Sequence, residues 1–176
     1  MRLRGCTIFL VLLTFSVFGY AAKKKTKAVF CTQSPGGWTL QQFEPLINPK
    51  GGTVFMELSF AGTTLEAARL RRFYPNREVA FDYKFDDKGR LTGLHGGVEV
   101  WGQWLGEADL TPEADGKVGK VHVEYYRAAS RDHITHPEDA DEYVTELSSV
   151  PIYRTIESLP CGGLLHEAEK MNATQE

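Results

Sequence analysis

Two histidines lie three residues apart in a segment rich in carboxylates, Arg131-Asp132-His133-Ile134-Thr135-His136-Pro137-Glu138-Asp139. Imidazole nitrogens and carboxylate oxygens are suitable ligands for zinc and similar metals. The spacing differs from His-Glu-x-x-His, in which two ligands share a helix face and a glutamate acts as base. The same residues are also typical of a polar loop that leads into a helix N-terminus. The segment therefore leaves two interpretations open, a metal site at His133 and His136 or a capped loop.

His122 is a second candidate for acid–base chemistry, because carboxylates such as Glu124 lie close to it in the sequence. Histidine paired with a carboxylate is a common proton-transfer device, although most sheet proteins contain such pairs. The chain has no Gly-x-Ser-x-Gly motif and no glycine-rich phosphate loop followed by Lys and Ser or Thr. Catalysis, if present, would therefore depend on His122 with a carboxylate or on His133 and His136 with a metal.

Aromatic residues on the polar side of extended segments point to a different chemistry. Trp101 alternates with Glu99 and Gln103 on the more polar face of a long extended stretch, and Tyr126 has the polar parity on the next one. A flat ring flanked by hydrogen-bonding groups binds sugar rings or apolar ligands, and concave sheets commonly provide such pockets. The alternative is that both faces are buried and these rings only pack. We interpret Glu99, Trp101, Gln103 and Tyr126 as a candidate ligand-binding surface.

The N-terminus has the three parts of a secretory signal peptide. Arg2 and Arg4 form a basic region, residues 6–18 are apolar, and small residues precede a cleavage point after Ala21. The apolar run is shorter than the roughly 20 residues that span a bilayer, which disfavours the alternative of an uncleaved anchor helix. We therefore expect export to a periplasm or secretion, with no stable membrane anchor in the mature chain.

Charge argues against nucleic acid as a partner. The chain has 20 basic and 23 acidic residues, a formal net charge of −3, and loss of Arg2 and Arg4 with the signal changes it to −5. The main basic cluster, Lys23 to Lys27, lies beside the cleavage site and is typical of a solvated segment. The remaining partners are a small ligand or an extracytoplasmic protein, and no sequence motif calls for a cofactor.

Two cysteines remain in the mature chain, Cys31 near its start and Cys161 near its end. An even pair in an exported protein predicts a disulfide, and two separate thiols are the alternative. In the chain-entropy model, closing a loop of about 130 residues stabilises the folded state by roughly 4–5 kcal/mol. The bridge would tie both ends of the domain to one body.

Alternating apolar residues predict the strands that must position these side chains. Strict alternation is found in residues 53–60 and 77–86, and Asp87-Lys88-Gly89 supplies a hairpin turn. Residues 98–110 read as one long strand that two glycines bend or curl. Shorter strands are expected around residues 121–125 and 152–156.

Helices are expected in three places. Residues 137–148 have apolar residues at i, i+3, i+4 and i+7, the pattern of a helix with one buried face. Residues 63–74 have a thinner apolar stripe and read as a helix that tertiary pairing could turn into a strand. Residues 40–47 are compatible with one or two helical turns.

The whole pattern predicts an α+β protein, an antiparallel β-meander of about five to seven strands in a curled or partly closed sheet, with two or three short helices. Residues 1–21 are the signal peptide, residues 22–161 a single domain, and residues 162–176 a flexible tail. We hypothesise an exported, disulfide-closed, non-enzymatic domain that binds a small ligand or an extracytoplasmic partner. The alternative is a small extracytoplasmic, hydrolase-like enzyme that uses the histidines.

Overall fold

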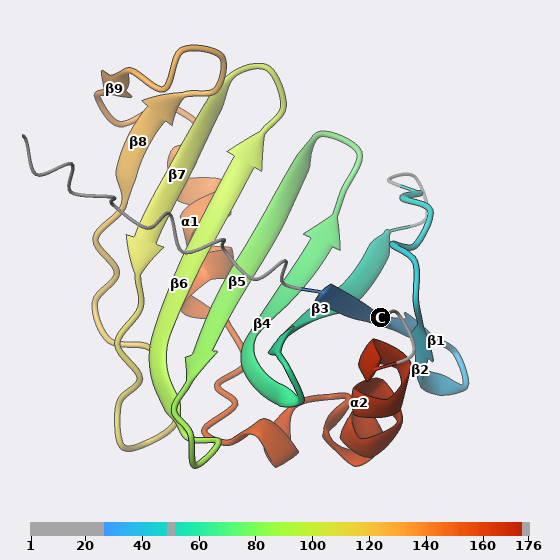
Figure 1. The fold of residues 1–176 in the computed structure, drawn as a ribbon. Coiled ribbons are helices and arrows are strands. Elements are labelled where there is room, and N and C mark those ends of the chain that lie inside the picture. Colours follow the sequence, from blue (N-terminus) through green and yellow to red (C-terminus); the bar gives the residue numbers. More distant parts are fainter. Residues whose placement is uncertain (1–26, 49–51, 174–176) are drawn as a thin grey trace, which may run out of the picture.

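The computed structural model describes residues 27–48 and 52–173, so the expected signal peptide lies outside the described residues. The described strands are β1 (Lys27–Ser34), β2 (Gly37–Gln41), β3 (Thr53–Ala61), β4 (Thr64–Phe73), β5 (Arg77–Phe85), β6 (Leu91–Val100), β7 (Trp104–Asp109), β8 (Glu124–Arg127) and β9 (His133–Ile134) (Figure 1). The helices are α1 (Ala140–Ser148), α2 (Leu165–Ala173) and two short 3-10 helices, η2 (Ile156–Ser158) and η3 (Gly162–Leu164).

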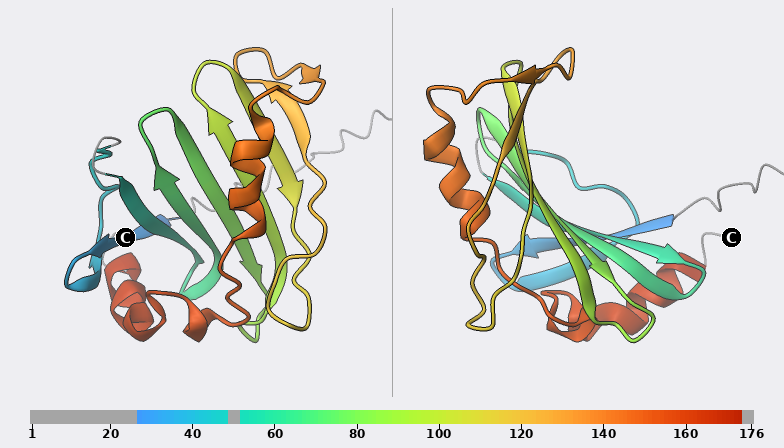
Figure 2. Two further views of the ribbon diagram at one scale, coloured as in Figure 1. Left: turned by 180° about the vertical axis from the view of Figure 1, so that it is seen from behind. Right: turned by 90° about the vertical axis from the view of Figure 1, so that its left-hand side faces the viewer.

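The nine strands form one antiparallel sheet in the order β2-β1-β3-β4-β5-β6-β7-β8-β9. From β3 onward each strand pairs with the next one in the chain, as in a meander, whereas β1 lies between β2 and β3. The sheet is twisted, and its two edge strands lie far apart (Figure 2). The prediction of an α+β protein dominated by an antiparallel sheet is therefore confirmed.

Successive residues of a strand point to opposite faces of the sheet, and here one face carries the core. We call it the covered face, because α1 and α2 both pack against it (Figure 2). Its fully buried side chains include Met56, Leu58, Val79, Phe81 and Val98. The opposite face, which we call the open face, has no helix packed on it in the described part of the chain.

Helix α1 confirms the prediction for residues 137–148, and its apolar stripe packs against the covered face. Tyr143 and Leu147 are buried there, one turn apart. Two polar contacts fix its position: Trp104 donates its indole N–H to Asp139 Oδ1 at 3.0 Å, and Arg77 Nε donates to Glu146 Oε1 at 3.1 Å. Because these contacts come from β7 and β5, they tie both ends of α1 to the sheet.

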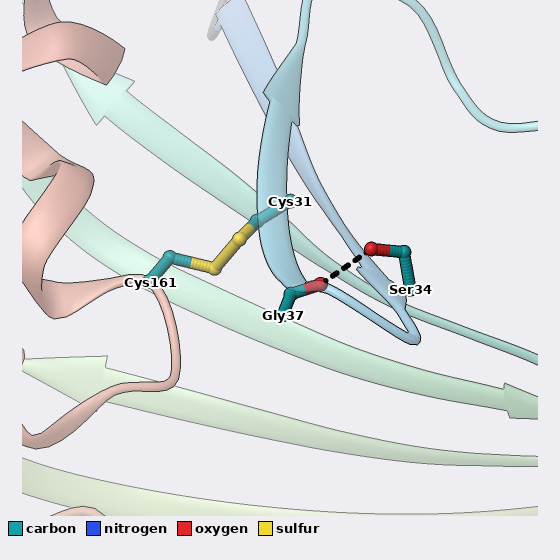
Figure 3. The surroundings of a disulfide bond; sticks show 4 residues. All are labelled: Cys31, Ser34, Gly37 and Cys161. Atoms are coloured by element: carbon teal, nitrogen blue, oxygen red, sulfur yellow. Dashed lines mark hydrogen bonds between the residues drawn. A yellow bond between two sulfur atoms is a disulfide. The ribbon is translucent and has the colours of Figure 1, made fainter.

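The predicted disulfide is present between Cys31 on β1 and Cys161 just before η3 (Figure 3). Both cysteines are fully buried in the core of the covered face. The hairpin that follows β1 is closed nearby by a hydrogen bond from Ser34 Oγ to the Gly37 carbonyl at 2.8 Å (Figure 3). The bridge therefore attaches the C-terminal helices to the strand next to one edge of the sheet.

The sheet differs from the prediction in size and shape, since it has nine strands rather than five to seven and is neither curled nor closed. The glycines thought to bend one long strand serve other purposes. Gly102, with φ of +72°, lies in the Trp101–Gln103 turn that separates β6 from β7, so the predicted strand 98–110 is two strands. Gly106, the second of these glycines, lies within β7 on the covered face, where a Cβ atom would come within 3.0 Å of Val123 Cγ1. Gly96, which precedes the predicted strand, lies under α1, where a Cβ atom would come within 2.9 Å of Leu110 Cδ1.

Several local predictions were wrong for reasons of tertiary pairing. Residues 63–74 form β4, because both β3 and β5 pair with this segment and override its thin helical stripe. Residues 40–47 form no helix; they contain the end of β2 and an irregular loop. Residues 152–156 make a single bridge, Arg90 with Thr155, in place of a strand. Residues 121–123 are irregular and pairing begins only at β8.

Residues 162–173, most of the segment expected to be a flexible tail, form η3 and α2. Ala168 is fully buried, and Asn172 Nδ2 donates a 2.7 Å hydrogen bond to the Gly62 carbonyl in the β3–β4 turn. The disulfide at Cys161 holds this segment beside β1, so its apolar residues have a surface to cover. Within residues 27–48 and 52–173, no helix is long and apolar enough to cross a membrane.

The neighbouring glycines Gly96 and Gly97 give a test of one-sided coverage. We expect Gly96→Ala to lower the free energy of unfolding by about 1–3 kcal/mol, because the new methyl would press on Leu110 and Leu147. Gly97→Ala, on the open face, should change it by less than about 0.5 kcal/mol. Urea unfolding measures both, and equal effects would contradict the assignment of faces.

The disulfide gives a second test. We expect the double variant Cys31→Ala/Cys161→Ala to be less stable than the oxidised protein by about 2–5 kcal/mol, because the unfolded chain gains conformational freedom. The measurement is urea unfolding with and without dithiothreitol. Reductant should destabilise the native chain and leave the double variant unaffected, whereas an unchanged native chain would argue against a stabilising bridge.

Candidate functional site

The middle of the open face is hollowed. Ala80 on β5 and Gly97 on β6 are register partners, and they form the floor of a shallow pocket of about 290 Å³. Larger and mostly charged side chains surround this floor: Arg69, Arg71, Glu78, Asp82, His95, Glu99, Leu105, Glu107 and Arg131. The pocket exists because the two central strands place their smallest outward-facing residues side by side. We call it the central hollow.

Arg71 is the most firmly held charge of the central hollow. Its Nε and Nη2 donate to the two carboxylate oxygens of Glu78 at 2.7 and 3.1 Å, and its Nη1 donates to Glu44 at 2.8 Å. Its guanidinium lies 4.8 Å from the ring centroid of Phe73 and 5.4 Å from that of Phe55. A planar, bidentate cation stacked on aromatic rings is thus fixed in place.

Burial of Arg71 disfavours its charged form, but the opposing effects are larger. The hydrogen bond and charge of Glu78, together with the charges of Glu44 and Glu57, raise the pKa of Arg71 above its usual value. The hydrogen bond from Arg71 to Glu44 attaches the loop at residues 42–48 to the open face.

The other two arginines of the central hollow also face carboxylates, although less tightly. Arg69 Nε lies 3.4 Å from Asp82 Oδ1, and Arg131 Nη1 lies 3.4 Å from Glu107 Oε1. Arg131 comes from the β8–β9 loop, and its φ of +62° is the one positive value among the described residues other than glycine. Such a conformation costs of order 1 kcal/mol. The β8–β9 loop therefore brings Arg131 to the central hollow through an unfavourable backbone conformation.

Glu99 differs from the other acids of the central hollow. Its side chain is exposed and makes neither a hydrogen bond nor an ion pair with any described residue. Its register partner on β5 is Glu78, so two carboxylates face each other across the strand pair. Like charges at such positions disfavour the sheet, and Glu78 is compensated by Arg71. The uncompensated negative charge beside the floor of the central hollow is therefore that of Glu99.

The predicted ligand-binding residues are only partly brought together. Glu99 and Tyr126 share the open face, as their parity predicts, and Leu105 lies between them in the register. Trp101 and Gln103 lie in the β6–β7 turn instead of on the strand, with Trp101 38% exposed. Glu99 alone of the four lines the central hollow. A hydrogen bond to Glu124 at 2.6 Å raises the pKa of Tyr126.

The histidines of the proposed metal site are held on different neighbours. His133 packs edge-on against Tyr126, with ring centroids 5.6 Å apart, and His136 packs against Tyr125 at 5.1 Å. Tyr125 and Tyr126 are consecutive strand residues and point to opposite faces, although both histidines line a hollow of about 500 Å³ that wraps around this edge. Across the described ranges, no group of three or more His, Cys, Asp or Glu could hold a metal ion.

His136 and His122 differ in their hydrogen-bond partners. His136 Nε2 lies 3.1 Å from Asp141 Oδ1 at the start of α1, and both side chains are at least half exposed. His122 lines the same hollow of about 500 Å³ as His133 and His136, and it also lines a smaller one of about 270 Å³ with Glu107 and Glu124. Its side chain makes no hydrogen bond to any described residue. The catalytic and metal roles of these histidines remain sequence-based predictions.

The floor and the arginines of the central hollow were missed by sequence reasoning. Their signal is a small residue at an outward position of a strand that otherwise carries charges there. Ala80 interrupts the series Glu78, Asp82 and Lys84, and Gly97 lies between His95 and Glu99. Recognising the hollow also requires the β5–β6 register, which the sequence pattern alone does not fix.

The fold and the central hollow together define an α+β protein with an open nine-stranded antiparallel sheet and a charged pocket on its uncovered face. Comparison with protein-family models, with curated proteins and with solved structures finds no match to this chain.

Arg71 gives a test of how much the contacts of its guanidinium stabilise the folded state. We expect Arg71→Lys to lower the free energy of unfolding by roughly 1–2 kcal/mol, because an ammonium keeps the charge but loses the bidentate hydrogen bonds and the stacking. Arg69→Lys is the matched control: its side chain is 50% exposed and its ion pair is long, so we expect a change below about 0.5 kcal/mol. Urea unfolding of both variants decides, and similar losses would contradict a special role for Arg71.

Proposed function

We propose that this chain is an exported, disulfide-closed, non-enzymatic domain that binds a small polar ligand in the central hollow. The observation that carries the proposal is the pairing of Ala80 with Gly97 at the floor of a ring of charged side chains. A sheet face that served only as a solvated surface would gain nothing from a depression of this kind. Concave sites with a few converging polar groups are typical of ligand binding.

The rigidity of the walls also supports a binding role. Arg71 is held by two carboxylates and two aromatic rings, so its guanidinium is in place before any ligand arrives. Preorganised groups bind with less loss of conformational freedom than mobile ones. Arg131, by contrast, is 64% exposed and makes one long contact, so its side chain can adjust its position when a ligand enters.

The candidate ligand-binding surface predicted from the sequence overlaps in part with the central hollow. Glu99 lines the central hollow, and Tyr126 lies beside Leu105, which lines it too. Trp101 and Gln103 lie in the turn two and four residues after Glu99 and do not line the central hollow. A buried disulfide is stable in oxidising compartments and supports export to a periplasm or secretion.

Filling the floor of the central hollow tests the proposal. Gly97→Leu places a side chain in the hollow, whereas Gly93→Leu places the same side chain on the same face of β6 outside it. Protein purified after export is heated with millimolar glucose, arginine, spermidine or inorganic phosphate, and the melting temperature is recorded.

A ligand that binds the folded state raises the melting temperature by mass action. We expect at least one of the four compounds to do so with the native chain and with Gly93→Leu, and the shift to vanish with Gly97→Leu. No shift with any compound, or an equal shift in Gly97→Leu, would overturn the proposal.

A further inference from the structure

We infer that the ligand of the central hollow is a small organic cation that carries ammonium groups. This inference rests on the proposed function and names the chemical class of ligand that the charges of the site select. It follows from which charges are compensated and which are free, from the size of the hollow, and from the side chains along the row that contains Glu99.

The positive charges of the central hollow are already engaged. Arg69 faces Asp82, Arg71 is bound to Glu78 and Glu44, and Arg131 faces Glu107. An anion that entered would have to take an arginine from a carboxylate and would leave that carboxylate behind, uncompensated, in the same pocket. The existing ion pairs therefore work against anionic ligands.

The free charge is negative. The Glu99 carboxylate makes no hydrogen bond or ion pair with a described residue, and it faces Glu78 across the β5–β6 pair. A cation beside Glu99 would gain a charge-assisted hydrogen bond and would relieve the repulsion between the two carboxylates. A neutral ligand would gain only the weaker hydrogen bond, so the site discriminates by charge.

Shape and neighbouring residues agree with a short organic cation better than with a bare metal ion. A hollow of about 290 Å³ has the volume of roughly ten water molecules, far more than one ion needs. Along the row that starts at Glu99 the floor continues over the buried side chain of Leu105 to the ring of Tyr126. A methylene chain packs on Leu105, and aromatic rings attract ammonium groups.

Titration calorimetry with spermidine as probe tests the inference, with glucose and inorganic phosphate as the neutral and anionic comparisons. We expect spermidine to bind the native chain, glucose and phosphate to bind at least tenfold more weakly, and added sodium chloride to reduce spermidine affinity. Glu99→Gln, which keeps the size of the side chain, should weaken spermidine binding roughly tenfold or more.

Two controls separate a built site from general attraction to an acidic protein. Glu66→Gln removes the same charge from an exposed position of β4 outside the central hollow, and we expect it to bind spermidine as the native chain does. Gly97→Leu changes no charge and should abolish binding. Equal losses in Glu99→Gln and Glu66→Gln would overturn the inference.

The outcomes also distinguish this inference from the proposed function. If glucose or phosphate gives the response that Gly97→Leu abolishes and spermidine gives none, the central hollow is a binding site and the cationic class is wrong. If Gly97→Leu binds spermidine as tightly as the native chain, the hollow is not the site and both statements fail.

Discussion

Coverage of a single face of the sheet by the C-terminal segment is the constraint on which the rest of the structure depends. Residues 140–173 supply both α-helices, and the disulfide fixes this segment to β1. Apolar side chains therefore gather on the covered face, where Leu147 and Ala168 close the core. The strands place most of their polar residues on the other face, because no described helix packs on it.

An uncovered face of nine strands requires its own internal organisation. Charged side chains that stand side by side on a sheet repel or attract their cross-strand neighbours, so their order matters. Here arginines on β4 and in the β8–β9 loop alternate with acids on β3, β5 and β7. Arg71 also shields Phe55, which is fully buried although it points to the open face. The alternation of opposite charges on this face therefore contributes to the stability of the sheet.

Sequence patterns predict those features that depend on residues near each other in the chain. Strict alternation located β3 and β5, and the apolar stripe located α1 with its buried Tyr143. Segment 63–74 could not be assigned in this way, because the hydrogen bonds that make it β4 come from both neighbouring strands. The tail could not be recognised as α2 either, since its stability depends on the surface beside Cys161. Glu99 was found from its parity, whereas the small floor formed by Ala80 and Gly97 depends on a register between two strands.

The arrangement around Glu99 is difficult to explain by stability. A carboxylate opposite Glu78 costs free energy, and none of the described residues compensates the charge on Glu99. Two small outward residues, Ala80 and Gly97, lie beside this charge and remove packing that larger side chains would provide. Arg131 adds the cost of a left-handed backbone conformation at the wall of the same hollow. Three unfavourable features therefore converge on one pocket, and local departures from the rules of stability are typical of functional sites.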